Sequence, residues 1–130
     1  MLPGEPGSGI SITGTGGTFN FGAVTITGAG DAGIDIDGLT SGTVNFNDAV
    51  DIDGAVTGIN LAASSVDVNF NGAVTIDGAT GTGINITGSV GQQITFTGLT
   101  DIGGTSRMAG DGVRLTNTDA TTQGSFADLD

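Results

Sequence analysis

Apolar residues alternate with polar ones in short runs along most of this chain, and glycine, serine, threonine and aspartate separate the runs. Val24-Thr25-Ile26 and Val74-Thr75-Ile76 are examples. An apolar residue at every second position is typical of a β-strand that buries one face, and no stretch shows the 3.6-residue period of a helix. The pattern therefore predicts an all-β chain of short strands joined by turns.

The runs recur in the same order about every 25 residues. Phenylalanines at positions 21, 46, 70 and 96 are spaced by 25, 24 and 26 residues, and a Gly-apolar-polar-apolar series begins at residues 9, 33, 58, 83 and 112. A third series begins at Val24, Val50 and Val74, with residues 99–102 as a bulged fourth copy. Each repeat holds three runs, so the sequence predicts a stack of three-stranded coils.

We expect a right-handed parallel β-helix, or β-solenoid, of about five coils with about 25 residues each. Stacked coils place equivalent strands side by side, so each backbone amide and carbonyl finds a partner in the next coil. The right-handed sense follows the rule for parallel crossovers. Residues 9–130 form a single solenoid domain in this interpretation, and residues 1–8 form a flexible arm.

The alternation assigns each position to the core or to the surface. Five inward rows are expected: Ile10/Ile34/Ile59/Ile84/Val113, Ile12/Ile36/Leu61/Ile86/Leu115, Phe19/Val44/Val68/Ile94, Phe21/Phe46/Phe70/Phe96, and Val24/Val50/Val74/Leu99. Three outward rows are expected: Asn20/Asn45/Asn69/Thr95, Thr25/Asp51/Thr75/Thr100, and Thr27/Asp53/Asp77. The asparagine row is either a set of solvated side chains or an amide ladder that hydrogen-bonds from coil to coil. Glycines 28, 54, 78 and 33, 58, 83 are expected at corners that need positive φ.

The charge of the chain limits the classes of partner that it can bind. Fourteen carboxylates face two arginines, which gives a formal charge of −12. Nucleic acid and anionic membrane are unsuited partners, because phosphate is bound by Lys and Arg. No run approaches the ~20 apolar residues of a membrane helix. Residues 1–9 lack the features of a secretory signal, so export would need a signal outside this sequence.

Candidate chemistry is sparse, and we do not expect an enzyme. The sequence has no Cys, His or Lys, which removes thiol chemistry and the commonest bases. No cofactor is expected. The best acidic cluster is Asp51, Asp53 and Asp77, where Asp53 and Asp77 fall in adjacent coils. These carboxylates are either a weak calcium site or simply the polar residues that an outward-facing strand surface requires.

One corner departs from the repeat. Residues 103–111 make it about four residues longer than its counterparts, and it carries Arg107 and Met108. Insertions in solenoids gather on one face, which is often used for contacts, but we favour the simpler interpretation that this is a tolerated insertion without a role.

Two segments carry a resemblance to a known class of proteins. The runs GTVNFNDAVDIDG at 42–54 and VNFNGAVTIDG at 68–78 resemble the β-strand repeats of very large bacterial surface proteins. Those repeats are related in style to autotransporter passengers and filamentous haemagglutinin helices. The resemblance covers about residues 9–117. It implies an extracellular or cell-surface location and a structural or adhesive role.

The expected function is that of a structural repeat module whose partner is a second copy of itself. Uncapped solenoid ends expose unpaired strand edges, so coils would stack head to tail into a filament or continue a longer solenoid. The side chains expected at the two ends are Ile10, Ile12, Phe19 and Phe21 at one and Val113, Leu115, Phe126 and Leu129 at the other. The alternative is an adhesin or a calcium-binding or ligand-binding module that uses a side face, with the ligand unknown.

Overall fold

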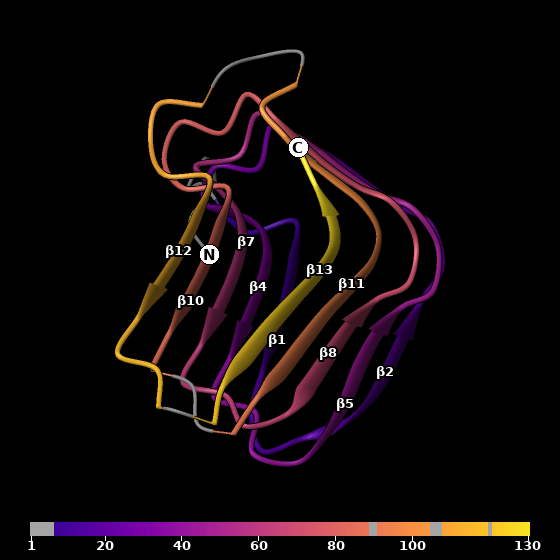
Figure 1. Cartoon of the computed structure of the whole chain (residues 1–130), viewed down its shortest axis with the longest axis vertical. Helices are drawn as coiled ribbons and strands as arrows, with labels where there is room; N and C mark the ends of the chain where they lie inside the picture. Colours follow the sequence, from indigo (N-terminus) through magenta and orange to yellow (C-terminus); the bar gives the residue numbers. More distant parts are fainter. Residues whose placement is uncertain (1–6, 89–90, 105–107, 120) are drawn as a thin grey trace.

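The structure is a computed structural model that describes residues 7–88, 91–104, 108–119 and 121–130. Thirteen strands and no helix make up its described elements, and all strand pairs are parallel. Equivalent strands lie side by side in chain order, from β2 to β13 on one side and from β1 to β12 on the other (Figure 1). The expected all-β solenoid of about five turns is confirmed. Its right-handed sense stays a prediction.

The first strand of every coil joins one five-stranded sheet, in the order β1-β4-β7-β10-β12. These strands are β1 (Ile10–Thr13), β4 (Ala32–Asp37), β7 (Thr57–Ala62), β10 (Ile84–Thr87) and β12 (Val113–Thr116). The register aligns residues that hold the same place in the repeat, for example Ile10 with Ile34 and Ile34 with Ile59. The repeat period in the sequence therefore sets the register of this sheet.

The second and third strands of the coils belong to one continuous sheet. The second strands are β2 (Gly17–Phe21), β5 (Gly42–Phe46) and β8 (Asp67–Phe70), and the third strands are β3 (Val24–Thr27), β6 (Val50–Asp53) and β9 (Val74–Asp77). In the last two coils, β11 (Gln93–Ile102) and β13 (Gln123–Leu129) run through the corner without a break. Three strands per coil therefore hold for the first three coils, and β11 links the two sides into one sheet.

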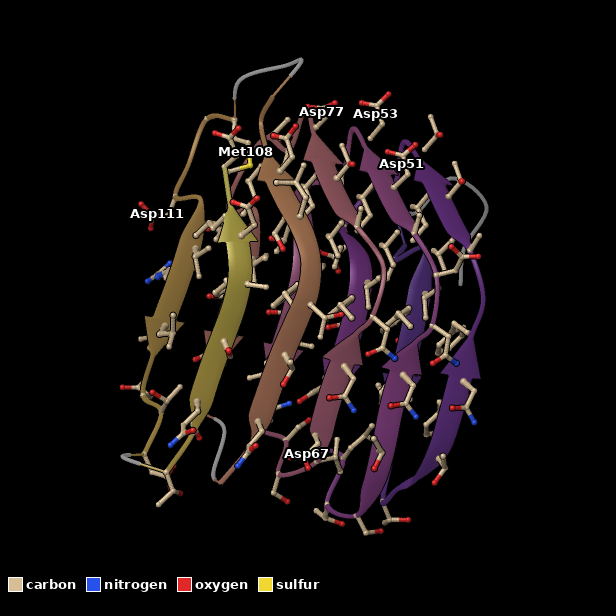
Figure 2. All side chains as sticks on the ribbon, turned by 45° about the vertical axis from the view of Figure 1, so that its right-hand side comes forward. Asp51, Asp53, Asp67, Asp77, Met108 and Asp111 are labelled. Carbon is tan, nitrogen blue, oxygen red and sulfur yellow. The ribbon has the colours of Figure 1, made fainter. Side chains whose placement is uncertain are left out.

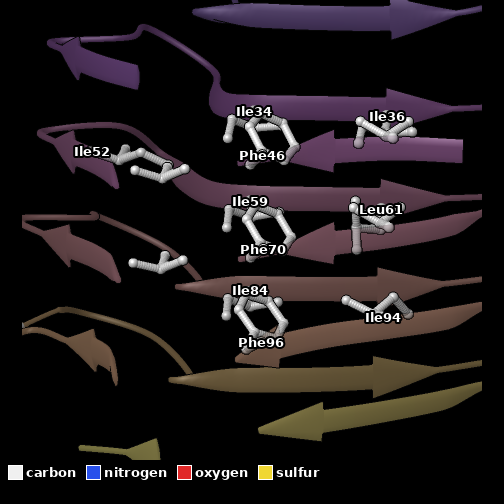
Figure 3. Packing of buried hydrophobic residues seen from close by; sticks show 14 of the residues in the cluster. Ile34, Ile36, Phe46, Ile52, Ile59, Leu61, Phe70, Ile84, Ile94 and Phe96 are labelled. Carbon is white, nitrogen blue, oxygen red and sulfur yellow. The ribbon is translucent and has the colours of Figure 1, made fainter. Parts of the chain in front are cut away.

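A stack of phenylalanine rings runs through the core. Phe21, Phe46, Phe70, Phe96 and Phe126 lie one above another, with ring centroids 4.9, 4.7, 4.6 and 4.5 Å apart and interplanar angles of 2° to 12°. The spacing matches the distance between hydrogen-bonded strands, because each ring comes from the same place in its coil. Figure 3 shows the three middle rings against the isoleucine row of the opposite sheet. The predicted phenylalanine row is thus core.

Glycine serves two different purposes in the coils. Gly28, Gly54 and Gly78 have φ of 67°, 76° and 61°, so these corners need the left-handed region, as expected. Gly58 lies inside β7, and a Cβ there would stand 2.5 Å from the carbonyl oxygen of Gly83. The expectation that glycines 33, 58 and 83 supply positive φ is therefore wrong. They allow neighbouring coils and an isoleucine side chain to approach the backbone closely.

The predicted inward position of Leu99 and the predicted outward position of Thr100 are also wrong. The register aligns Thr100 with Val74 and Ile102 with Ile76, so Thr100 occupies the core row and Leu99 is 44% exposed. Residues two apart share a face of a strand, so an inward Leu99 would carry Asp101 into the core with it. Burying a carboxylate costs more than burying a threonine hydroxyl, which explains the observed register.

The arm and the long corner are partly outside the described residues. Of the expected flexible arm over residues 1–8, the structure describes Gly7 and Ser8. Arg107 also lies outside the described residues. Met108 packs against the core, and the backbone amide of Gly110 donates to the carbonyl of Gly81 at 3.1 Å. The C-terminal part of this insertion therefore lies against the preceding coil.

Candidate functional site: side-chain ladders and two end faces

The acidic residues are spread along the surface. Asp53 and Asp77 are aligned in adjacent strands, while Asp51 is aligned with Thr75. Figure 2 shows these three where the coils turn at one end of the strands, with Asp67 at the opposite end of the strands. Over the described part of the chain, no three Asp, Glu, His or Cys side chains are grouped so that they could hold a metal ion. Calcium takes six to eight oxygen ligands. A calcium site at Asp51, Asp53 and Asp77 stays a prediction, and two adjacent carboxylates would bind weakly.

No pocket is found over the described residues. Within the same ranges, no helix is long and apolar enough to cross a membrane. The features that remain are the polar ladders on the outer faces and the two ends of the stack.

The asparagine row forms an amide ladder on the outer face of the second strands. The Nδ2 of Asn45 donates to the Oδ1 of Asn20 at 2.9 Å, and the Nδ2 of Asn69 donates to the Oδ1 of Asn45 at 2.9 Å. Of the two readings that the sequence left open, the hydrogen-bonded ladder is the correct one. Each amide ties its own coil to the one before it.

A second ladder runs along the first strands and shows the same direction. Asn85 donates to the Oδ1 of Asn60, and Asn60 donates to the Oδ1 of Asp35, both at 2.8 Å. A third ladder has a single bond, which the Nδ2 of Asn71 donates to the Oδ1 of Asn47 at 3.1 Å. Each of these ladder bonds is donated toward the N-terminal coil, so the first member of a ladder needs only to accept. Aspartate can therefore start the second ladder, because a carboxylate accepts but does not donate.

The direction of the ladder predicts different results for one substitution at two positions. We expect Asn45→Asp to lower the free energy of unfolding at pH 7 by about 1 to 3 kcal/mol, since it removes the donor to Asn20 and sets two oxygens against each other. Asn20→Asp keeps the acceptor for Asn45 and is expected to cost less than about 0.5 kcal/mol. Urea melts of both variants measure the difference. Equal losses would show that the ladder has no direction in solution.

A carboxylate at one corner joins the last two coils. The Oδ1 of Asp119 accepts hydrogen bonds from the backbone amides of Gly91, Thr121 and Thr122, at 3.2, 3.1 and 2.9 Å. The hydroxyl of Thr121 donates to the Oδ2 at 2.8 Å. The Thr121 hydroxyl, followed by the Gly91 amide, lowers the pKa of Asp119 from its ordinary 3.8 to about 2. These donors favour the charged form, although the group is exposed.

The lowered pKa of Asp119 predicts a pH-dependent contribution to stability. A group whose pKa is lower in the folded chain stabilises it fully above its ordinary pKa of 3.8, and that contribution is lost as the pH falls toward about 2. We therefore expect Asp119→Asn to lower the melting temperature near neutral pH, and the difference from wild type to shrink as the pH approaches the pKa of about 2. An NMR titration of the Asp119 carboxyl that gave an ordinary pKa would contradict this.

The two ends of the described stack expose side chains of rows that are buried inside it. Leu115 is aligned with the fully buried Ile86 and is 51% exposed, and Leu129 is aligned with the fully buried Thr100 and is 50% exposed. Of the other predicted end residues, Ile10, Phe19, Phe21, Val113 and Phe126 are partly buried, and Ile12 is buried. The predicted residues thus lie in the first and last coils, and Ile12 is already covered.

Two buried polar side chains that lack a hydrogen-bond partner among the described residues were not predicted from the sequence. Gln92 and Thr100 are fully buried, and the Nε2 and Oε1 of Gln92 and the Oγ1 of Thr100 have no hydrogen-bond partner. Both belong to the fourth coil, whose repeat is the least regular. A signal for Gln92 exists in hindsight, since it stands two residues before the inward Ile94 and therefore faces inward too.

The fold and the ladders can be set against known proteins. No family model matches this chain. Neither a curated protein nor a solved structure matches it. The β-solenoid arrangement therefore stands on the structure itself.

Proposed function

We propose that this chain is a structural solenoid module that stacks its end faces on further coils of the same kind. The observation that carries the proposal is the half-exposed Leu115 at one end of a row that is otherwise buried. For the chain by itself the partner is a second copy, joined head to tail. In a longer protein the same edges would meet neighbouring coils. The resemblance to repeats of bacterial surface proteins adds the proposal of an extracellular or cell-surface location.

Strand edges give the first reason for stacking. Among the described strands, β1, β2 and β3 pair with the second coil, and β12 and β13 pair with the fourth. The opposite edge of each of these strands has no strand partner in the described chain. Such an edge presents unpaired amides and carbonyls and is a template for another strand. A contact between one end and the other does not close on itself, so it grows into a filament.

Charge opposes the contact. A formal charge of −12 on each copy repels the next copy. At 0.1 M salt the repulsion between charges more than about 10 Å apart is largely screened, so stacking is expected to increase with ionic strength.

The test compares two leucines of similar exposure that lie in different places. Leu115 is 51% exposed at the end of the stack, and Leu99 is 44% exposed on the bulge between the second and third sides. Leu115→Asp puts a carboxylate on the end face, and Leu99→Asp makes the same change on the side. We expect the wild type and Leu99→Asp to assemble with rising concentration in sedimentation velocity, and Leu115→Asp to stay monomeric. Negative-stain images of the wild type should show filaments.

Two outcomes would contradict the proposal for separate copies. If the wild type stays monomeric at high concentration and high salt, separate copies do not stack. The partner of these edges would then be a neighbouring coil of a longer chain. Loss of assembly in Leu99→Asp but not in Leu115→Asp would place the contact on a side face, as the adhesin alternative requires.

A further inference from the structure

One outer row of the first sheet carries side chains of opposite charge near its two ends. Arg114 lies in β12, on the outer face of the last coil. Every other charged side chain among the described residues is an aspartate. The register aligns Arg114 with Asn85, so its row reads Ser11, Asp35, Asn60, Asn85 and Arg114 from the first coil to the last. Arg114 therefore stands at the last position of this row, and Asp35 stands one coil inside the other end.

We propose that Arg114 of one copy pairs with Asp35 of the next copy across the junction, which fixes the head-to-tail direction of stacking. This inference rests on the proposed function. In a stack that continues the register, Arg114 meets Ser11 of the next copy first and Asp35 one coil further. Two strand spacings separate Arg114 from Asp35, about 10 Å between backbones. The short Ser11 leaves the path over it open, and the long arginine side chain spans the distance together with the aspartate.

The surroundings of Asp35 favour binding of a guanidinium. Its Oδ1 already accepts the amide of Asn60 at 2.8 Å, which holds the carboxylate on the outer face. Asp35 is partly buried, so a pair made there is less screened than one between fully exposed side chains. The guanidinium presents several donors in a plane and suits a carboxylate better than an ammonium does. A tail-to-tail contact offers Arg114 no Asp35, because Asp35 lies near the other end of each copy.

The apolar parts of the two ends are complementary as well. Phe19 stands at one end of the row that continues through Val44. At the other end the same row passes through Ile94 to Gly124, which has no side chain. In the last coil this row therefore ends in a residue without a side chain, beside which Phe19 of the next copy would lie. In the same register, Phe21 of the next copy continues the ring stack after Phe126. A second copy of this chain is thus the occupant that both ends fit.

Two charge-reversed chains test the pair. In Arg114→Asp each junction sets Asp against Asp35, and in Asp35→Arg each junction sets Arg against Arg114. We expect each variant alone to need roughly tenfold more protein than the wild type to assemble in 0.1 M salt, which corresponds to about 1.4 kcal/mol. In an equimolar mixture the two variants can alternate along the stack, and every junction of such a stack then sets opposite charges against each other. The mixture is therefore expected to assemble like the wild type. Sedimentation velocity and negative stain follow all four samples.

The mixture separates the pair from the effect of net charge. The first variant makes the formal charge of −12 more negative by two units, and the second makes it less negative by two. If net charge alone controlled assembly, Asp35→Arg would assemble better than the wild type. Circular-dichroism melts establish that each chain is folded. If Asp35→Arg does not fold, Asp35→Asn is used in its place, because the amide oxygen of asparagine can still accept the hydrogen bond from Asn60. It is then expected to assemble less well than the wild type in spite of its smaller negative charge.

The outcomes distinguish this inference from the proposed function. Variants that assemble like the wild type, or a mixture no better than its components, would overturn the Arg114–Asp35 pair and leave stacking through the end faces intact. A wild type that never assembles would overturn both.

Discussion

Phe70→Ala is expected to lower the free energy of unfolding by about 3 to 5 kcal/mol, the usual cost of emptying a buried aromatic site. The side chain of Phe70 is fully buried, and rings lie above and below it at 4.7 and 4.6 Å. The substitution removes both ring contacts and leaves a cavity between two coils that the backbone ladder holds apart. Urea or thermal melts measure the loss.

The same substitution at the end of the ring stack is the control. Phe126 is partly buried and stacks on Phe96 at 4.5 Å, with no further described coil beyond it. We expect Phe126→Ala to cost about half as much as Phe70→Ala, since less apolar area is removed from water in the folded state. A change within about 0.5 kcal/mol for Phe70→Ala would contradict the burial of the ring stack, because changes of that size are typical of surface positions.

Gln92→Leu is expected to raise the free energy of unfolding by about 1 to 3 kcal/mol. Burying an amide without hydrogen bonds carries a cost of that order, and leucine has a similar size without the polar atoms. Gln92 is fully buried, and neither its Nε2 nor its Oε1 has a hydrogen-bond partner in the part of the chain that the structure describes. Its row includes the buried Val66, so an apolar side chain already suits this place in the preceding coil.

Gln93 provides a neighbour of identical chemistry on the other face. It is exposed, and its backbone amide donates to Asp67 at 3.1 Å. We expect Gln93→Leu to change the stability by less than about 0.5 kcal/mol. A loss of stability in Gln92→Leu would mean that the buried amide has partners in solution, such as an internal water, and that its burial is not a defect of the fourth coil.

The fold could be predicted from the sequence because its order is local and repeated. Period-two alternation assigns a face to each residue, and a 25-residue period places the same residue type at the same point of every coil. Stacking then aligns like with like, as in the row of Ile34, Ile59 and Ile84. Neither step requires knowledge of distant contacts, since each coil contacts only its neighbours.

The candidate site could be predicted less completely. The asparagine row was visible as a set of equivalent positions, but its hydrogen bonds and their common direction depend on side-chain geometry between coils. The acidic residues on outer faces were visible too. Their separation into a pair and scattered single residues depends on how adjacent strands are aligned.

The sequence by itself determined the solenoid, its period and the rows that form its core, because these follow from alternation and repetition alone. The tertiary structure decided the places where the repeat is irregular. In the fourth coil it placed Thr100 inward and Leu99 outward, since the opposite register would have buried Asp101. It buried Gln92 and merged two sides of the coil into β11. At such positions local pattern allows two registers, and the backbone ladder of the neighbouring coil selects one.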